Sequence, residues 1–536
     1  MKNGTAASIA INVGVRAEPV ATPVAALAFI CELSEILSGA GVCALIEGRQ
    51  VAVFRVGEQV FALSNRDPAS DANVLSRGIV GDLKGELVVA SPIYKHHYSL
   101  MTGQCQENPD LFVDVFPARV IDGHVMVDVR APQPRRYGKR RLVVVGNGMA
   151  GMRAVEELLK QAPDAYEIVV FGAEPHGNYN RILLSPVLSG EKKKEDIVLH
   201  SPEWYIEHGV KLHMGDAVVA IDRNKRTVKS AQGVEVTYDR LLLATGSQPI
   251  ILPVPGAKLP GVITFRDLAD VDAMIKRAGR GRRAVVIGGG LLGLEAANGL
   301  RLRGMDVTVV HLLDTLMERQ LDSAAATLLR ASLASRGLAF KMPAQTSEFV
   351  GEDHVRAVRF KDGTEIEADL VVMAVGVRPN IELAKSAGVQ CERGVLVDDT
   401  LQTYDPAIYA VGECVQHRKL TFGLVAPLWE QARVCAMHLA ERGVSRYRGT
   451  LPATQLKVTG IELYSAGEFH GSEHAEDIVL RDPGREIYKR LIVRDNKLRG
   501  AVLFGDASAG PWYAELIEAG KDVGGLRDRL LFGPDA

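Results

Sequence analysis

The stretch Gly146-Asn-Gly-Met-Ala-Gly151 decides the fold, and it recurs in altered form as Gly288-Gly-Gly-Leu-Leu-Gly293. Each copy follows a short apolar run and precedes a segment with helical patterning. In a strand–GxGxxG–helix unit the first Gly makes a tight turn, the second lets the backbone approach a pyrophosphate, and the third lets the helix pack against the strand. The two copies therefore predict an α/β fold with two Rossmann-like dinucleotide-binding domains.

The residues after each motif indicate that the two copies bind different dinucleotides. The strand that follows the first motif ends shortly before Glu174, whose carboxylate can accept hydrogen bonds from the ribose hydroxyls of a dinucleotide. In the second copy the corresponding strand, Val307-Thr-Val-Val310, is followed by His311. This position offers neither an acid for the ribose of NADH nor an Arg for the 2′-phosphate of NADPH. The sequence leaves the choice of nucleotide open.

Two later segments point to a flavin. Leu241-Leu-Leu-Ala-Thr-Gly246 reads as a buried strand ending in Ala-Thr-Gly, and Tyr409-Ala-Val-Gly-Glu413 as a strand ending in Gly412 with an acid behind it. An acid at such a strand end can accept a hydrogen bond from the ribityl chain, while a following helix offers its amides to phosphate. Their order after the first motif favours FAD as the cofactor of the first copy.

Composition shifts along the chain predict several domains. The expected organisation is a disordered leader (1–28), a small all-β domain (29–131), an FAD-binding domain (140–262 and 370–445), an NAD(P)H-binding domain (263–369) and a C-terminal α+β domain (447–536).

The overall composition is typical of a soluble globular protein. The 536 residues carry a formal net charge of −2, which gives no electrostatic case for nucleic acid or a membrane surface as partner. No apolar run is long enough to span a membrane. The six cysteines have no C-x-x-C spacing, so we expect a reduced, cytoplasmic protein without a metal site.

The motifs together resemble the two-dinucleotide-fold flavoprotein reductases. More narrowly, Tyr179-Asn-Arg-Ile-Leu-Leu-Ser-Pro186 and Leu316-Met-Glu-Arg-Gln-Leu-Asp322 are similar to the FAD-containing N-terminal portion of the large subunit of bacterial assimilatory nitrite reductases. The N-terminal β domain, with Asn65-Arg-Asp-Pro68 and Ala90-Ser-Pro-Ile-Tyr-Lys95, resembles the small subunit of the same enzymes, a Rieske-like domain.

This resemblance implies roles for individual residues. Arg181 would lie near the flavin, Val218 would offer its backbone to the adenine, and Gly376 would approach the nicotinamide nucleotide. The expected FAD-binding residues are Gly146, Gly148, Gly151, Glu174, Arg181, Val218, Thr245, Gly246, Gly412 and Glu413. The expected NAD(P)H-binding residues are Gly288, Gly290, Gly293, Glu295, His311 and Gly376. The C-terminal domain would be an interface domain through which such reductases dimerise.

Missing ligands shape the expected cofactor set. A Rieske cluster needs two Cys and two His, and the matching places hold Asn65 and Asp67, then Ser91 and Tyr94. We therefore expect no iron–sulfur cluster in this domain. The cysteines that would serve a sirohaem module are also absent, so we expect no sirohaem and a cofactor set of FAD and NAD(P)H alone.

The expected activity is that of a diaphorase. The loop from Asn178 to Ser185 has no Cys, which excludes a thiolate nucleophile at that place. Electrons would pass from NAD(P)H through FAD to a separate redox acceptor, a nitrite or nitrate reductase subunit or a ferredoxin. Two alternatives stay open: a ferredoxin or rubredoxin reductase unconnected with nitrogen, and a non-catalytic flavoprotein redox sensor.

Overall fold

The computed structural model describes residues 27–83, 85–108, 110–130, 139–441, 445–456, 458, 460–471 and 474–534. The expected leader lies almost wholly outside these residues. Contacts within the chain divide it into two units, with the boundary in the sequence between residues 138 and 139. Among the described helices, none is long and apolar enough to cross a membrane.

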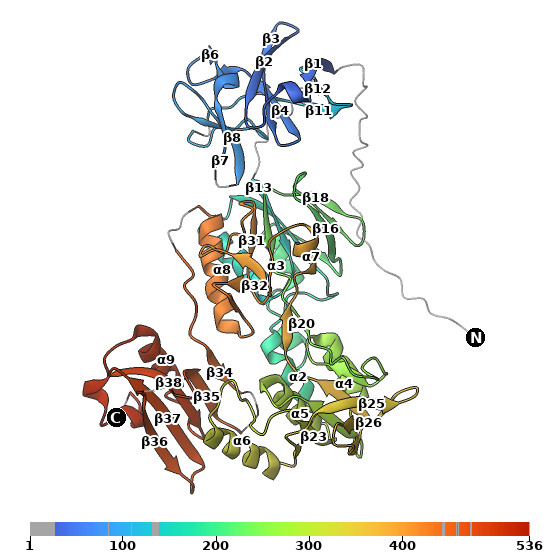
Figure 1. The fold of residues 1–536 in the computed structure, drawn as a ribbon, viewed down its shortest axis with the longest axis vertical. Helices are drawn as coiled ribbons and strands as arrows, with labels where there is room; N and C mark the ends of the chain where they lie inside the picture. Colours follow the sequence, from blue (N-terminus) through green and yellow to red (C-terminus); the bar gives the residue numbers. More distant parts are fainter. Residues whose placement is uncertain are drawn as a thin grey trace. The chain divides into compact units, whose positions relative to one another are not determined.

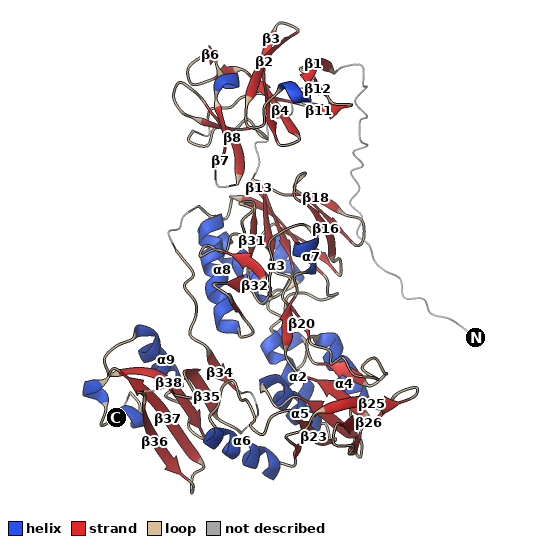
Figure 2. Ribbon diagram, viewed as in Figure 1, coloured by secondary structure: helices blue, strands red, loops and turns tan. Residues whose placement is uncertain are grey.

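The N-terminal unit is built of short antiparallel strands, drawn in red in Figure 2. Its largest sheet has the order β10-β4-β3-β2, and two smaller sheets have the orders β1-β12-β11 and β7-β8-β9. The four residues Val51 to Phe54 of β3 are all buried, and its two faces contribute to two hydrophobic clusters, one around Phe54, Leu63 and Tyr98 and the other around Val51 and Val53. The bounds are β1 Ala28–Glu32, β2 Gly41–Ile46, β3 Arg49–Val56, β4 Gln59–Ser64, β5 Arg66–Asp67, β6 Ala72–Asn73, β7 Ile79–Leu83, β8 Glu86–Ala90, β9 His97–Ser99, β10 Val115–Phe116, β11 Ala118–Ile121 and β12 His124–Val127.

The first α/β sheet is parallel and has the order β15-β14-β13-β19-β31. Its central strands are runs of Val and Leu because both faces are covered. Helix α1 packs against α8, the orange helix of Figure 1. The bounds are β13 Arg140–Val145, α1 Met149–Gln161, β14 Tyr166–Gly172, α2 Leu184–Ser189, α3 Pro202–Glu207, β15 Val210–Met214, β19 Arg240–Leu243, β31 Ile408–Ala410 and α8 Val425–Leu439.

The second α/β sheet repeats this plan with the order β21-β28-β22-β23-β24. Its strands and helices are β21 Val262–Thr264, α4 Leu268–Arg277, β22 Arg283–Ile287, α5 Leu291–Leu302, β23 Asp306–Val310, α6 Ser323–Ser335, β24 Ala339–Lys341 and β28 Leu370–Met373. Strand β28 pairs with β21 and β22. The predicted return to the first domain at residue 370 is therefore wrong by one strand, because a buried apolar strand near a boundary does not reveal its sheet.

Smaller elements connect the two sheets. Strands β20 Ser247–Pro249 and β29 Val377–Pro379 pair antiparallel and carry the chain across and back. Three further small sheets lie between or beside strands of the main sheets in sequence. Their strands are β16 Val218–Asp222, β17 Thr227–Ser230 and β18 Glu235–Thr237; β25 Thr346–Gly351, β26 Val355–Phe360 and β27 Glu365–Glu367; and β30 Val395–Val397, β32 Val415–His417 and β33 Leu420–Thr421, with the short helix α7 Glu382–Ser386 beside β16.

The C-terminal part is an antiparallel sheet of order β34-β35-β38-β37-β36, covered by α9. Its bounds are β34 Ala453–Gln455, β35 Leu463–Gly467, β36 Glu476–Asp482, β37 Ile487–Arg494, β38 Lys497–Phe504 and α9 Gly510–Ala519. Leu463, Tyr488 and Phe504 share one hydrophobic cluster with residues of the second α/β sheet and its helices, including Leu329 of α6. This part of the chain is therefore packed against the nucleotide-type domain.

Asp322 holds this contact together. Its carboxylate caps α6 at Ala325 N–H (2.8 Å) and accepts hydrogen bonds from Tyr488 Oη (2.7 Å) and Arg490 Nη1 (3.1 Å). Burial and the Asp322 hydrogen bond raise the pKa of Tyr488. Asp322 is only 6% exposed, and its loss would leave the largely buried Arg490 guanidinium with Asp477 as its remaining carboxylate partner.

We predict that Asp322→Ala destabilises the chain by about 2 to 3 kcal/mol, because it removes the side-chain cap of α6 and the acceptor of the Tyr488 and Arg490 hydrogen bonds. Thermal unfolding followed by intrinsic fluorescence measures the effect as a lowered midpoint. Asp314→Ala, at an exposed acid eight residues earlier, is the matched control. Equal midpoints for the two variants would show that Asp322 does not stabilise this contact.

Candidate functional site

The first glycine motif has the backbone geometry that a phosphate loop requires. Gly146 has φ +119°, and a Cβ there would lie 2.2 Å from Ala244 O. At Gly151 a Cβ would lie 2.8 Å from Gly146 O, so only Gly lets α1 approach the strand. Gly148, the N-cap of α1, faces open space and contributes no side-chain cap.

The second motif repeats this geometry. Gly288 has φ +124° and Gly293 would bring a Cβ to 2.0 Å from Gly288 O, while Gly290 faces open space as the uncapped N-cap of α5. In the same domain, Asp267 and Asp322 cap α4 and α6 with their side chains. Helices α1 and α5 thus begin with free amides and the positive end of the helix dipole, which suits an anion.

A cleft of about 600 Å³ opens beside the first motif. The predicted residues that line it are Gly146, Gly148, Glu174, Arg181, Thr245, Gly246, Glu295, Gly412 and Glu413. Thr454 and Gln455 of the C-terminal sheet line it too. Of the other predicted residues, Gly151 packs beneath the loop, Val218 lies on β16, and Gly288, Gly290, Gly293, His311 and Gly376 belong to the second domain; none of these is among the lining residues of this cleft.

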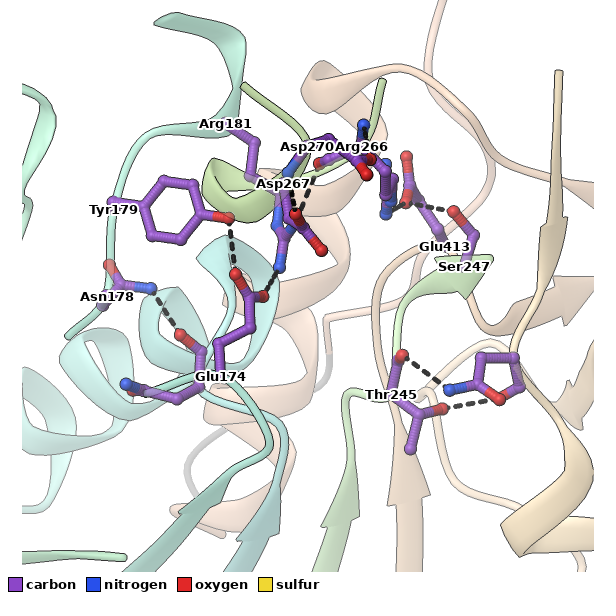
Figure 3. A network of polar contacts seen from close by, with 12 residues as sticks. Glu174, Asn178, Tyr179, Arg181, Thr245, Ser247, Arg266, Asp267, Asp270 and Glu413 are labelled. Carbon is purple, nitrogen blue, oxygen red and sulfur yellow. Dashed lines mark hydrogen bonds and ion pairs between the residues drawn. The ribbon is translucent and has the colours of Figure 1, made fainter. Parts of the chain in front are cut away.

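One side of the cleft is built around Glu174 (Figure 3). Tyr179 Oη donates to its carboxylate (2.7 Å), and the Arg181 guanidinium forms an ion pair with it. Arg181 also donates to Arg266 O (3.0 Å), which ties the loop after β14 to the second domain. Burial opposes the charged guanidinium, but Tyr179 and Glu174 beside it keep the pKa of Arg181 above its usual range.

The opposite side is built around Glu413. Its carboxylate pairs with Arg266 and accepts a hydrogen bond from Ser247 Oγ (2.8 Å), as Figure 3 shows. Thr245 Oγ1 donates to Asn380 O (2.7 Å), which fixes the strand end next to Gly246. These contacts bring together four segments that are separated in sequence, around residues 245–247, 266, 380 and 413.

Buried polar atoms show that the first motif fits FAD. Asn147, between the first two glycines, accepts a hydrogen bond from Tyr205 Oη (2.8 Å), but its Nδ2 is buried and has no partner among the described residues. A ligand at the loop would satisfy this donor. The uncapped α1 suits a pyrophosphate, and the Glu174 and Glu413 carboxylates suit ribose and ribityl hydroxyls at either end of the same cleft.

Glu295 reaches this cleft from the second motif. It lies on α5, is 5% exposed, and accepts a hydrogen bond from Ser185 Oγ (2.7 Å) on α2. Helix α5 therefore begins at the second phosphate loop and presents one turn of side chains to the first cleft. This arrangement brings the two predicted dinucleotide sites next to each other.

His311 lies directly after β23 and touches the second phosphate loop. Gly289 N–H donates to His311 Nδ1 (3.1 Å). A Cβ on Gly289 would lie 2.8 Å from the imidazole Cγ, so the loop and the ring are in close contact. The predicted position of His311 at the nucleotide site remains a prediction, now with a defined ring orientation.

Sequence reasoning missed several residues of the cleft. Tyr179 stood within a motif that the resemblance used, but Arg266, Ser247 and Asn380 carried no signal. Arg266 comes from the turn between β21 and α4 and meets Glu413 only through the fold. Long-range ion pairs of this kind have no local sequence pattern.

The cysteines are all free thiols. Cys414 is next to Glu413, but it is fully buried and donates to Val411 O (3.3 Å). Burial raises the pKa of the Cys414 thiol, which keeps it protonated. Thiolate chemistry is therefore not favoured at this residue.

Family models match three parts of the chain. Residues 140–438, more than half of the chain, match the pyridine nucleotide-disulphide oxidoreductase family. Residues 27–128 match the Rieske-like [2Fe-2S] domain, and residues 452–521 match the rubredoxin NAD+ reductase C-terminal domain.

Individual proteins are also similar. The chain is 50% identical over 386 residues to a nitrite reductase [NAD(P)H] of Bacillus subtilis, covering 72% of this chain and 48% of that protein. It is 47% identical over 393 residues to the assimilatory nitrate reductase electron transfer subunit of the same organism, covering 73% and 51%. The chain thus spans about half the length of these relatives. The putidaredoxin reductase–putidaredoxin complex matches with TM-score 0.66 and 27% identity, covering 72% of this chain and 94% of that chain.

The Rieske-like match overturns one prediction. The expectation of no iron–sulfur cluster is contradicted, because the family of the N-terminal domain and the nitrite reductase relatives point to such a cluster. The prediction was wrong because it weighed ligand residues alone and not the family to which the β domain belongs.

The residues present do not fit the two-Cys, two-His ligand set at the two matching loops. Asp67 accepts hydrogen bonds from Ser91 Oγ, Ser70 Oγ (3.0 Å) and Tyr98 Oη (2.8 Å), so side-chain hydrogen bonds join the loops. Across the described residues, no group of three or more His, Cys, Asp or Glu is placed to hold a metal ion.

The fold class and the resemblance are confirmed by these comparisons together with the two glycine motifs and their sheets. The chain belongs to the pyridine nucleotide-disulphide oxidoreductase family and carries a Rieske-like domain at its N-terminal side.

Proposed function

We propose that this chain takes hydride from a reduced nicotinamide dinucleotide and passes the electrons, through bound FAD, to a separate redox acceptor protein. The observation that carries the proposal is that α1 and α5 each begin at a glycine motif without a side-chain cap, on two separate parallel sheets. Side chains of α5 also line the cleft beside the first motif, so the two sites are neighbours. The domains would be FAD-binding in 140–262 and from about 380 to 445, NAD(P)H-binding between them, and an interface domain in 447–536.

The residues of the cleft would hold the flavin nucleotide from both ends. Gly146, Gly148 and the α1 amides would bind the pyrophosphate, Glu174 the adenosine ribose, and Glu413 the ribityl chain. When bound, FAD would supply the chemistry that no side chain here offers, since it accepts a hydride and can release the electrons one at a time. The chain's own contribution is positioning, because hydride transfer depends on close approach more than on an acid or base.

The acceptor is proposed to belong to nitrite or nitrate assimilation. The two Bacillus subtilis relatives, named as a nitrite reductase and a nitrate reductase electron transfer subunit, support this. The similarity to putidaredoxin reductase favours a second candidate, a ferredoxin-type acceptor unconnected with nitrogen. We further propose a cytoplasmic location, consistent with six free thiols, and a homodimer through the C-terminal domain, whose edge strand β36 exposes Val479.

Anaerobic reduction tests the proposed activity. The flavin-loaded protein, mixed with NADH or NADPH, should lose its flavin absorbance, and adding ferricyanide should restore it with continued turnover. Candidate acceptor proteins are then added to the reduced enzyme, and the rate at which each reoxidises the flavin is measured. The faster acceptor decides between an acceptor of nitrite or nitrate assimilation and a ferredoxin-type acceptor. Bound flavin that neither nucleotide reduces would contradict the proposal and favour a redox sensor.

We predict that Glu413→Gln weakens FAD binding about 10- to 100-fold, since a charge-assisted hydrogen bond contributes about 1.5 to 3 kcal/mol. Titration of the apoprotein with FAD, followed by flavin fluorescence, measures the dissociation constant. Glu235→Gln, at an exposed strand position in the same domain, is the control. An unchanged dissociation constant in Glu413→Gln would remove Glu413 from the flavin site.

A further inference from the structure

The proposed second nucleotide site contains an acid, Glu318, that does not directly follow the strand and therefore has no recognisable spacing in the sequence. His311 occupies the position after β23 where a carboxylate would bind the adenosine ribose. Glu318, seven residues later, places its Oε2 3.3 Å from His311 Nε2. The loop of residues 312–322 therefore places the Glu318 carboxylate beside His311, at the end of a strand that has no acid of its own.

The hydrogen bond from Gly289 defines which nitrogen of the His311 ring accepts and which carries the proton. Because Gly289 N–H donates to Nδ1, that nitrogen is the acceptor and the ring proton belongs on Nε2. Nε2 is buried, and despite its ion-pair distance from Glu318 it makes no hydrogen bond among the described residues. The site therefore combines a donor with spare capacity and a carboxylate that can accept from a hydroxyl.

Hydrogen bonds on both sides of Glu318 fix the position of the loop that carries it. Met317, the preceding residue, is fully buried, donates its N–H to Gly289 O (3.0 Å), and adopts φ +49°, a left-handed conformation that non-Gly residues keep only where the surroundings enforce it. Further along, Ser465 Oγ donates to Gln320 O (2.6 Å). The C-terminal sheet therefore supports the loop.

The charges around His311 oppose a phosphate. Residues 312–320 carry Asp314 and Glu318 against the single exposed Arg319. Lys341, whose carbonyl accepts the His311 N–H (3.2 Å), directs its ammonium to Asp362 (3.2 Å). A 2′-phosphate would meet the Glu318 carboxylate, whereas a 2′-hydroxyl could donate to it and accept from His311 Nε2.

We propose that His311 and Glu318 together read the adenosine ribose and make the chain select NADH over NADPH, with Glu318 as the specificity-determining acid. The inference rests on the proposed function, because it assigns a substrate to the second site of that scheme. It requires nothing of the FAD site, so binding of nucleotide fragments tests it separately.

Calorimetric titration of the flavin-loaded full chain with ADP-ribose and with 2′-phospho-ADP-ribose is the test, because bound FAD occupies the first dinucleotide site. The wild type should bind ADP-ribose at least about tenfold more tightly, and Glu318→Gln should reduce that ratio about tenfold, mainly by tighter binding of the phosphorylated fragment. Glu318 is partly exposed, so the variant should fold. Glu352→Gln, an exposed acid on the β25–β26 turn, is the matched control and should keep the wild-type ratio.

The outcomes separate the two claims. Equal affinity for the two fragments, a preference for the phosphorylated one, or an unchanged ratio in Glu318→Gln would overturn the role of Glu318 and leave the proposed function standing. Failure of the wild type to bind either fragment would overturn the second nucleotide site, and with it the proposed function. His311→Ala should weaken ADP-ribose binding, and full retention of affinity would also count against the pair.

Discussion

Two helices that begin without side-chain caps constrain the rest of this structure. At α1 and α5 the N-cap is a Gly facing open space, and the first Gly of each motif, Gly146 or Gly288, lies against a carbonyl that no Cβ could tolerate. Free amides at a helix start are costly unless water, a side chain or a ligand satisfies them. In each domain the parallel sheet places the glycine loop at the end of a strand, and the close packing of the helix on that strand points the free amides at the loop.

The cleft beside α1 is held by polar contacts of Arg266, which comes from the second domain. Arg266 pairs with Glu413 on one side of the site, and its carbonyl accepts a hydrogen bond from Arg181 on the other, where Arg181 also pairs with the nearby Glu174. A carboxylate held by a guanidinium keeps its charge and its direction, and its remaining lone pairs can still accept hydroxyl groups. The same arrangement makes the site dependent on the relative position of the domains, which the β20–β29 pair and the C-terminal sheet maintain.

The glycine motifs made both sheets predictable, because each Gly answers a local steric demand that the sequence displays directly. Glu174 and Glu413 were predictable for a similar reason, since each follows a buried strand. Arg266 and Glu318 were not, because their partners are set by tertiary contacts rather than by spacing. Strand β28 was assigned to the wrong domain, since an apolar strand reads alike in either sheet. The cofactor expectation for the N-terminal domain failed where ligand residues were weighed without the family of the whole domain.

The most direct measurement for the central claim is the flavin content of the purified chain. After incubation with excess FAD and removal of free cofactor, heat release should yield one FAD per chain, identified as the dinucleotide by chromatography. Replacing the open Gly148 by Val should abolish this content while the circular dichroism spectrum is retained. A wild-type chain that is folded but retains no flavin would contradict the account, because the first glycine loop would then serve some other ligand.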